Sequence, residues 1–351
     1  MKRITAVVSA LVLVVMALAG CGSSGDSASS PTLTLVTWGG TTADGIRQAI
    51  ADPFTKETGI ATNVTEPVDY GKYTAQIEQN QVTWDWVDLE AFFIIAHRDW
   101  WAPVDPNVVK IDPADVIQLP GGQGTNVDGL MPAGSYSFAI SYRTENQKPH
   151  PTTWAEFFDT AKFPGKRAIY NSPFGMLEVA LLADGVPFDK LYPLDVARAE
   201  RKLESIRGDL VFWNSGAELQ QIMTSGEADF AFAWNNRIAD IQKKGAPVAI
   251  EWNENLQDGG FNVTPKNGPR VAETMKYFGF WAQPQIQADY AKTTGYSPAL
   301  KSAFDLLPEE DKPYYNAYPE NMAKAVGTIN LDWWAKNYDA TVEQWSTWAG
   351  Q

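Results

Sequence analysis

Aromatic side chains at the ends of apolar stretches are the residues in this chain best suited to bind a ligand. Trp38 ends one such stretch, and Trp234 ends another, directly before Asn235 and Asn236. Rings that face a ligand cation contribute about 2 kcal/mol or more when the pair is desolvated, and an aromatic wall also suits an alkyl chain. We interpret Trp234 as a ligand platform at the mouth of a strand.

Motifs for catalysis or metal binding are not recognisable. His97 and His150 have no metal-ligand partner at close spacing, and the chain has no Gly-rich phosphate loop, nucleophile elbow or HExxH motif. The adjacent tyrosines Tyr314 and Tyr315 lack an accompanying histidine or carboxylate at a strand end, which argues against iron. We therefore predict no catalytic residue, no metal and no cofactor, although two acids far apart in sequence could still form a hydrolase pair.

The N-terminus indicates export and lipid anchoring. Lys2 and Arg3 precede an apolar run over residues 4–19, which is shorter than the roughly 20 residues of a membrane span. The run leads into Leu-Ala-Gly-Cys, which resembles a bacterial lipobox, and Cys21 is the only cysteine. We expect a signal peptide at 1–20, then a lipidated Cys21 and a flexible Gly/Ser-rich tether at 21–31.

The remaining 331 residues, 21–351, are enough for two domains, and they are acidic. The formal net charge is −14, and it becomes −16 when the two basic residues of the signal are removed. This charge excludes nucleic acid as a partner, because such binding depends on basic side chains that meet phosphates. It favours cationic ligands.

Alternating patterns predict an α/β protein with mostly parallel sheets. Strands are expected at 32–40, 61–64, 165–172 and 228–234, with another at the start of residues 84–93, and helices at 41–59, 193–210 and 331–348. Two capping boxes, at residues 153–156 and 215–218, indicate helix starts, and Gly59 a helix end. In such sheets ligands bind beyond the carboxyl ends of strands, where Trp38 and Trp234 lie.

Four groups of segments resemble the spermidine/putrescine-binding family of ABC transporter solute-binding proteins. They are LVTWGG with DPFTKETGI, WDWVDLEAFF, SGEADFAFAWNNRIADIQKKGAPV, and VTPKNGP with TTGYSPALKSAF. The resemblance implies a two-lobe periplasmic-binding-protein fold of type II, with a hinge, crossover strands and an interlobe ligand cleft. We expect lobe 1 to comprise 32–135 plus 260–310, and lobe 2 to comprise 136–259 plus 311–351.

The resemblance also implies a set of cleft residues. Trp38, Trp234 and Tyr296 match family aromatics, Phe92 falls where many members have tyrosine, and Glu90 falls where they have a small hydroxyl residue. At the positions of the family's amine-binding acids this chain has Ser172, Gly175 and Gly260. Asp258 falls where a tryptophan is expected, and a two-residue shift in the alignment would make it the ammonium partner. The candidate ligand-binding residues are Trp38, Glu90, Phe92, Ser172, Phe174, Trp234, Asn235, Asp258 and Tyr296.

The function expected from these features is capture of a small amine-bearing solute and its delivery to ABC permease subunits. The solute would be a polyamine such as putrescine or spermidine, or a related compound such as a γ-amino acid. Arg237 or Asn235 could bind the carboxylate of such an amino acid. We expect a monomer, anchored outside the cytoplasm through Cys21. The alternatives are a sugar or oligosaccharide receptor of the same architecture, a secreted carboxylate-dependent hydrolase, and a structural lipoprotein that binds no small molecule.

Overall fold

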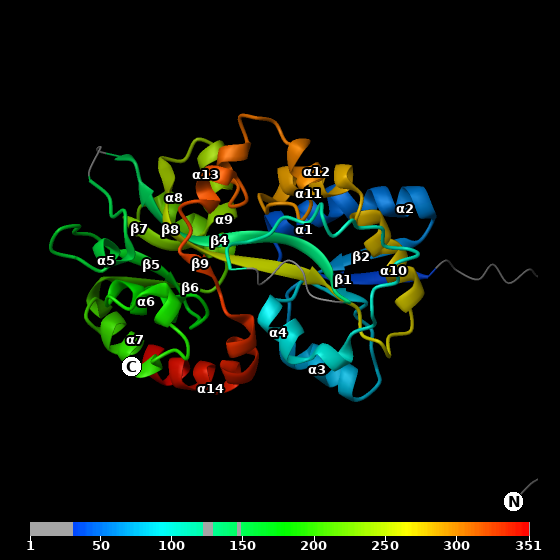
Figure 1. Ribbon diagram of the computed structural model, residues 1–351, viewed down its shortest axis with the longest axis horizontal. Coiled ribbons are helices and arrows are strands. Elements are labelled where there is room, and N and C mark those ends of the chain that lie inside the picture. The colour runs from blue at the N-terminus through cyan, green and yellow to red at the C-terminus, as the bar shows by residue number, and fades with distance from the viewer. Residues whose placement is uncertain (1–30, 122–128, 146–148, 351) are drawn as a thin grey trace, which may run out of the picture. The chain divides into compact units, whose positions relative to one another are not determined.

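A small parallel sheet begins the fold, and its strand ends lead to the candidate site. In the computed structural model, which describes residues 31–121, 129–145 and 149–350, β1 (Thr32–Val36) lies between β2 (Ala61–Thr65) and β3 (Trp86–Val87) (Figure 1). Both pairings are parallel. The strands predicted near 32, 61 and 86 are therefore confirmed, and the carboxyl ends of β1 and β3 meet at one edge.

The helix predicted after β1 is divided into three parts. It consists of α1 (Thr41–Ile46), a π-helical segment η1 (Arg47–Ala51) and α2 (Asp52–Thr58). The proline at position 53 has no N–H to donate four residues back, and the wider π turn directly precedes it. The helix ends at Gly59, whose φ of 74° is left-handed, as glycine permits.

The second sheet has the order β6-β5-β7-β4-β8-β9. The strands β5 (Arg167–Tyr170), β6 (Leu210–Trp213) and β7 (Phe230–Trp234) pair in parallel. Two longer strands, β4 (Met131–Arg143) and β8 (Val248–Asn262), are antiparallel to each other, and β9 (Gly327–Thr328) lies at the edge. Five of the seven pairings among the described residues are parallel, which agrees with the predicted mixed, mostly parallel arrangement.

The long pair β4 and β8, which Figure 1 shows running through the centre of the fold, was not identified from local sequence patterns. Its register changes between Pro132 and Gly134 and again between Phe138 and Ile140. Such irregularities bend and twist a strand pair. The lobe boundaries predicted after Ser135 and after residue 259 fall opposite each other, because these two residues are Cα partners. The division into lobes at these positions stays a prediction.

Helices cover the sheets, and several begin as their caps predict. The Thr153 and Ser215 side chains accept from the backbone N–H three residues on, at Glu156 and Glu218. Each glutamate, however, accepts from the backbone N–H of the residue before the cap rather than from that of the cap itself.

The remaining helices are α3 (Tyr70–Glu78), α4 (Ala91–Ala96), α5 (Trp154–Phe157), α6 (Met176–Ala183), α7 (Val196–Glu204), α8 (Gly216–Ser225), α9 (Asn235–Lys243), α10 (Val271–Trp281), α11 (Pro284–Thr294), α12 (Lys301–Asp305), α13 (Pro319–Met322) and α14 (Leu331–Ala349), with short 3₁₀ turns η2 (Arg98–Trp100), η4 (Phe188–Lys190), η5 (Arg207–Asp209) and η6 (Lys312–Tyr314).

The expected signal peptide at 1–20, the lipidated Cys21 and all but the last residue of the tether lie outside the described residues. Within the described ranges, none of the helices combines the length and apolar character needed to span a bilayer.

Candidate ligand-binding cavity

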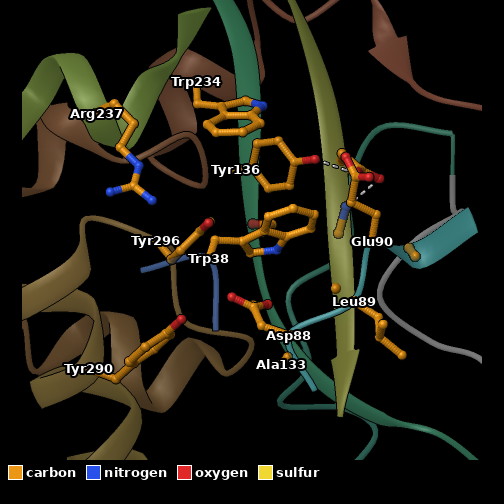
Figure 2. A pocket seen from close by; sticks show the side chains of 16 residues that line it. Trp38, Asp88, Leu89, Glu90, Ala133, Tyr136, Trp234, Arg237, Tyr290 and Tyr296 are labelled. Atoms are coloured by element: carbon orange, nitrogen blue, oxygen red, sulfur yellow. Dashed lines mark hydrogen bonds between the residues drawn. The ribbon is translucent and has the colours of Figure 1, made fainter. Parts of the chain in front are cut away.

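A cavity forms where the two sheets present their strand ends. Its walls come from the residues after β1 and β3, from β4 and β8, from the end of β7 and the start of α9, and from α11 and the turn after it. It encloses about 70 Å³, which is less than the roughly 300–1,000 Å³ of typical small-molecule sites. Figure 2 shows the lining side chains.

Five of the predicted residues line this cavity: Trp38, Glu90, Trp234, Asp258 and Tyr296. They are brought together from positions up to 258 residues apart in the sequence, since Trp38 and Tyr296 belong to one cavity. Arg237, which the sequence suggested for a ligand carboxylate, also lines it.

Four predicted residues lie outside the cavity lining. Phe92 and Phe174 are fully buried and pack on each other with ring centroids 5.4 Å apart, because both point into the core beneath the site. Phe92 also stacks on Tyr338 of α14 at 4.0 Å. Ser172 lies in a separate surface depression beside α14. Asn235 is buried, and its Oδ1 accepts from the backbone N–H of Ser137 at 2.8 Å, so its side chain holds β4 against α9.

Two carboxylates form an acidic corner, and each accepts from a tyrosine. The Tyr136 hydroxyl donates to Oδ2 of Asp258 at 2.8 Å, and the backbone N–H of Gly259 donates to Oδ1. The Tyr70 hydroxyl donates to Oε2 of Glu90 at 3.0 Å. Asp258 is only 1% exposed. Burial raises the pKa of Asp258 to about 8 and that of Glu90 to about 7, despite these hydrogen bonds.

A third carboxylate, Asp88, follows β3 directly. Its backbone N–H donates to the carbonyl of Val36, which fixes the residue beside the end of β1. The buried Oδ2 atom of Asp88 has no hydrogen-bond donor. Burial raises the pKa of this carboxyl to about 7, although the charge of Arg237 acts to lower it.

Arg237 supplies a buried cation to the opposite part of the cavity. Its side chain is 3% exposed, and its two terminal nitrogens donate to the Thr41 and Thr42 hydroxyls at 2.6 Å and 2.9 Å. No carboxylate of the described residues lies within 4.0 Å of its nitrogens. A buried guanidinium without an anionic partner is costly, so a ligand anion at this place would be stabilised.

Aromatic rings separate the acidic corner from Arg237. Tyr136 lies edge-on to Trp234 at 6.5 Å and to Tyr296 at 5.9 Å. Trp234 also packs on Trp213 at 4.8 Å, so its ring belongs to the core as well as to the cavity wall. Its buried Nε1–H has no acceptor. Trp38 completes the wall, as Figure 2 shows.

The lining residues that sequence reasoning missed include the polar side chains of Asp88, Tyr136 and Tyr290. Asp88 had a usable signal, since it directly follows an apolar strand whose carboxyl end belongs to the same edge as that of β1. Tyr136 had none, because its role depends on the pairing of β4 with β8, which places it opposite Asp258. Among the described residues, no group of three or more His, Cys, Asp or Glu side chains is placed to hold a metal ion.

Comparison with known proteins finds relatives along most of the chain. The γ-aminobutyric acid-binding protein of Pseudomonas aeruginosa is 29% identical over 332 residues, 92% of each protein. The solved structure of the Atu4243 GABA receptor is 34% identical, with a TM-score of 0.79 over 91% of this chain and 97% of that one. The binding protein AgtB of A. tumefaciens R10, solved with agropinic acid, is 30% identical, with a TM-score of 0.79 over 92% and 99%.

The likeness to a polyamine receptor is more distant. The spermidine/putrescine substrate-binding protein PotD of Streptococcus pneumoniae is 17% identical, with a TM-score of 0.68 over 91% of this chain and 99% of that one, which shows the fold alone. The two-lobe periplasmic-binding-protein fold predicted from the sequence is confirmed by these structures.

A family model for bacterial extracellular solute-binding proteins matches residues 49–323, which is well over half of the chain. Together with a solved relative at 34% identity, this match settles the family. The chain belongs to the bacterial extracellular solute-binding protein family.

Proposed function

We propose that this protein captures a small amine-bearing solute outside the cytoplasm and delivers it to the transmembrane permease of an ABC importer. The observation that carries the proposal is the acidic corner of Glu90 and Asp258, which faces a wall of aromatic rings. Carboxylates form charge-assisted hydrogen bonds with an ammonium group, and the rings stabilise the same cation and pack on its alkyl chain.

The polarity of the cavity favours an amino compound that also carries an anion. Arg237 lies across the rings from Glu90, so the two ends of the cavity have opposite charge when the acid is ionised. Related proteins named for γ-aminobutyric acid and agropinic acid support this class of ligand. A pure polyamine would leave Arg237 without an anionic partner, and a neutral sugar would leave both charged ends uncompensated.

Binding measurements on the purified chain from residue 22 onward test the proposal. γ-Aminobutyrate, L-ornithine, putrescine, spermidine and maltose would be titrated by isothermal calorimetry. We expect an amine to bind, and the Glu90→Gln and Asp258→Asn variants to weaken it by tenfold or more, since hydrogen bonds to charged groups contribute about 1.5–3 kcal/mol.

Two surface variants serve as matched controls. Glu57→Gln on α2 and Asp305→Asn on α12 remove the same charges from exposed positions and should leave affinity unchanged. Binding of maltose with none of the amines would refute the proposal. So would amine affinity that is equal in the wild type and in both cavity variants.

A further inference from the structure

Asp88 differs from the other two carboxylates of the cavity in its partners. Glu90 and Asp258 each accept from a tyrosine hydroxyl, whereas the buried Oδ2 atom of Asp88 has no donor. A buried acceptor without a donor costs free energy, and a carboxylate costs more than a neutral group. A ligand that brings a donor to Asp88 removes this cost.

The position of Asp88 separates it from the acidic corner. Figure 2 shows the ring of Trp38 between Asp88 and Tyr136, the tyrosine that donates to Asp258. Tyr296 lies between Asp88 and Arg237 in the same view. Arg237 is also the opposite charge that acts on the Asp88 carboxyl. Asp88 and Arg237 therefore place one anion and one cation around Tyr296.

The charges of the cavity lining do not balance. Three carboxylates, Asp88, Glu90 and Asp258, face one guanidinium, Arg237, so two negative charges are in excess when all three acids are ionised. A γ-amino acid has no net charge and leaves this excess unchanged. A ligand with a second ammonium group reduces the excess and provides a donor for Asp88.

We infer that Asp88 is a specificity-determining residue, and that the cavity takes a basic α-amino acid such as ornithine or lysine. The inference rests on the proposed function and narrows its ligand class. The α-carboxylate would bind Arg237, the α-ammonium would bind Asp88, and the distal ammonium would bind Glu90 and Asp258. The methylene groups between the two ends would pack on Trp38, Trp234 and Tyr296.

This assignment distinguishes three kinds of amine. γ-Aminobutyrate fills the Arg237 and Asp258 ends but brings nothing to Asp88. Putrescine brings two ammonium groups but no carboxylate for Arg237. Ornithine brings all three charged groups, and Nα-acetyl-L-ornithine carries a neutral, bulkier acetamide in place of the α-ammonium group.

Calorimetric titration of the wild-type protein with these four ligands and with L-lysine tests the inference. We expect L-ornithine or L-lysine to bind at least tenfold more tightly than γ-aminobutyrate and putrescine, and Nα-acetyl-L-ornithine to bind at least tenfold more weakly than L-ornithine. In Asp88→Asn, the ratio of the ornithine affinity to the γ-aminobutyrate affinity should fall by tenfold or more. Asp305→Asn is the matched control, and thermal melting without ligand shows whether each variant is folded.

The outcomes separate this inference from the proposed function. If γ-aminobutyrate or putrescine binds more tightly than both basic amino acids, the role of Asp88 is refuted while amine capture stands. Equal affinity for ornithine and its Nα-acetyl derivative also refutes it, and this comparison needs no variant to fold. If none of the amines binds, the proposed function itself fails.

Discussion

The carboxylates of the cavity show how burial alters the chemistry of single residues. Asp258 and Glu90 are held by tyrosine hydroxyls, yet burial raises their pKa values to about 8 and about 7. Near neutral pH the empty cavity therefore retains protons on its acids. An ammonium group that binds there has to replace a proton, which couples ligand affinity to pH.

We predict that amine affinity rises with pH between about 6 and 8. Each ammonium group that displaces one proton from Asp258 or Glu90 raises the ligand affinity by up to about tenfold per pH unit, as long as the pH is below the pKa of that acid. Asp88 titrates in the same range, with its pKa at about 7. Calorimetry at pH 6, 7 and 8, repeated in buffers of different ionisation enthalpy, measures the affinity and the protons released.

The stability of the empty protein should respond to pH in the opposite direction. The pKa of Asp258 is higher in the folded protein than in the unfolded chain. The contribution of this carboxyl to folding stability is therefore fully present below about pH 4 and is lost as the pH rises to about 8. Removing this carboxyl in Asp258→Asn should reduce the fall in melting temperature over that range. The predicted coupling of amine affinity to pH would be contradicted by an affinity that stays constant from pH 6 to 8 with no release of protons.

The sequence predicts where strands end better than it predicts which side chains meet across paired strands. Trp38 and Trp234 could be assigned to the cavity because each directly follows an apolar, β-branched or alternating run. Asp258 was placed by resemblance alone. Its partner Tyr136 was not predicted, because the two residues are 122 positions apart and meet only through the register of β4 and β8.

At the scale of elements, α4 connects the cavity to the C-terminal helix. Glu90 immediately precedes α4, and the next residue but one, Phe92, stacks on Tyr338 of α14 at 4.0 Å. Phe92 is 1% exposed and also contacts Phe174. The family resemblance suggested a ligand contact for Phe92, which falls where many members have tyrosine, but the first turn of α4 points its ring into the core.

Truncation of this ring tests its packing role. We predict that Phe92→Ala lowers the free energy of unfolding by about 3–5 kcal/mol, because a buried phenylalanine is replaced by a void. Chemical denaturation of the two proteins measures the difference. Leu306→Ala is the matched control, since Leu306 is 48% exposed and its loss should change stability by no more than about 0.5 kcal/mol. If the Phe92→Ala protein is as stable as the wild type but has lost ligand affinity, Phe92 contributes to ligand binding and not to packing.

Short-range signals predicted the helices better than the long strands. The caps at Thr153 and Ser215, and the left-handed end at Gly59, depend on neighbouring residues and were confirmed. The strand β8 contains Glu254 with a φ of 57°, and its partner β4 changes register twice. These irregularities interrupt the period-2 pattern that identifies a strand, so only the three-dimensional pairing reveals the element.

At the scale of the whole molecule, one strand pair organises both the fold and the cavity. Tyr136 on β4 and Asp258 on β8 are Cα partners, and the predicted lobe boundaries fall beside them. The residues of the cavity thus converge where the two long strands cross between the predicted lobes. Local patterns could not give this arrangement, because it depends on contacts far apart in sequence. Resemblance to known receptors supplied the prediction of two lobes.

The predicted lipid anchor concerns how the whole protein reaches its permease. Burial of acyl chains contributes about 0.8 kcal/mol per CH₂ group, so a lipidated Cys21 would hold the protein at a membrane. We predict that Cys21→Ser moves the protein from the membrane fraction to the soluble extracytoplasmic fraction of a bacterial host. Immunoblots of the two fractions measure this, and Ser23→Ala is the control in the same segment. A Cys21→Ser protein that stays with the membrane would show that its attachment does not depend on the cysteine.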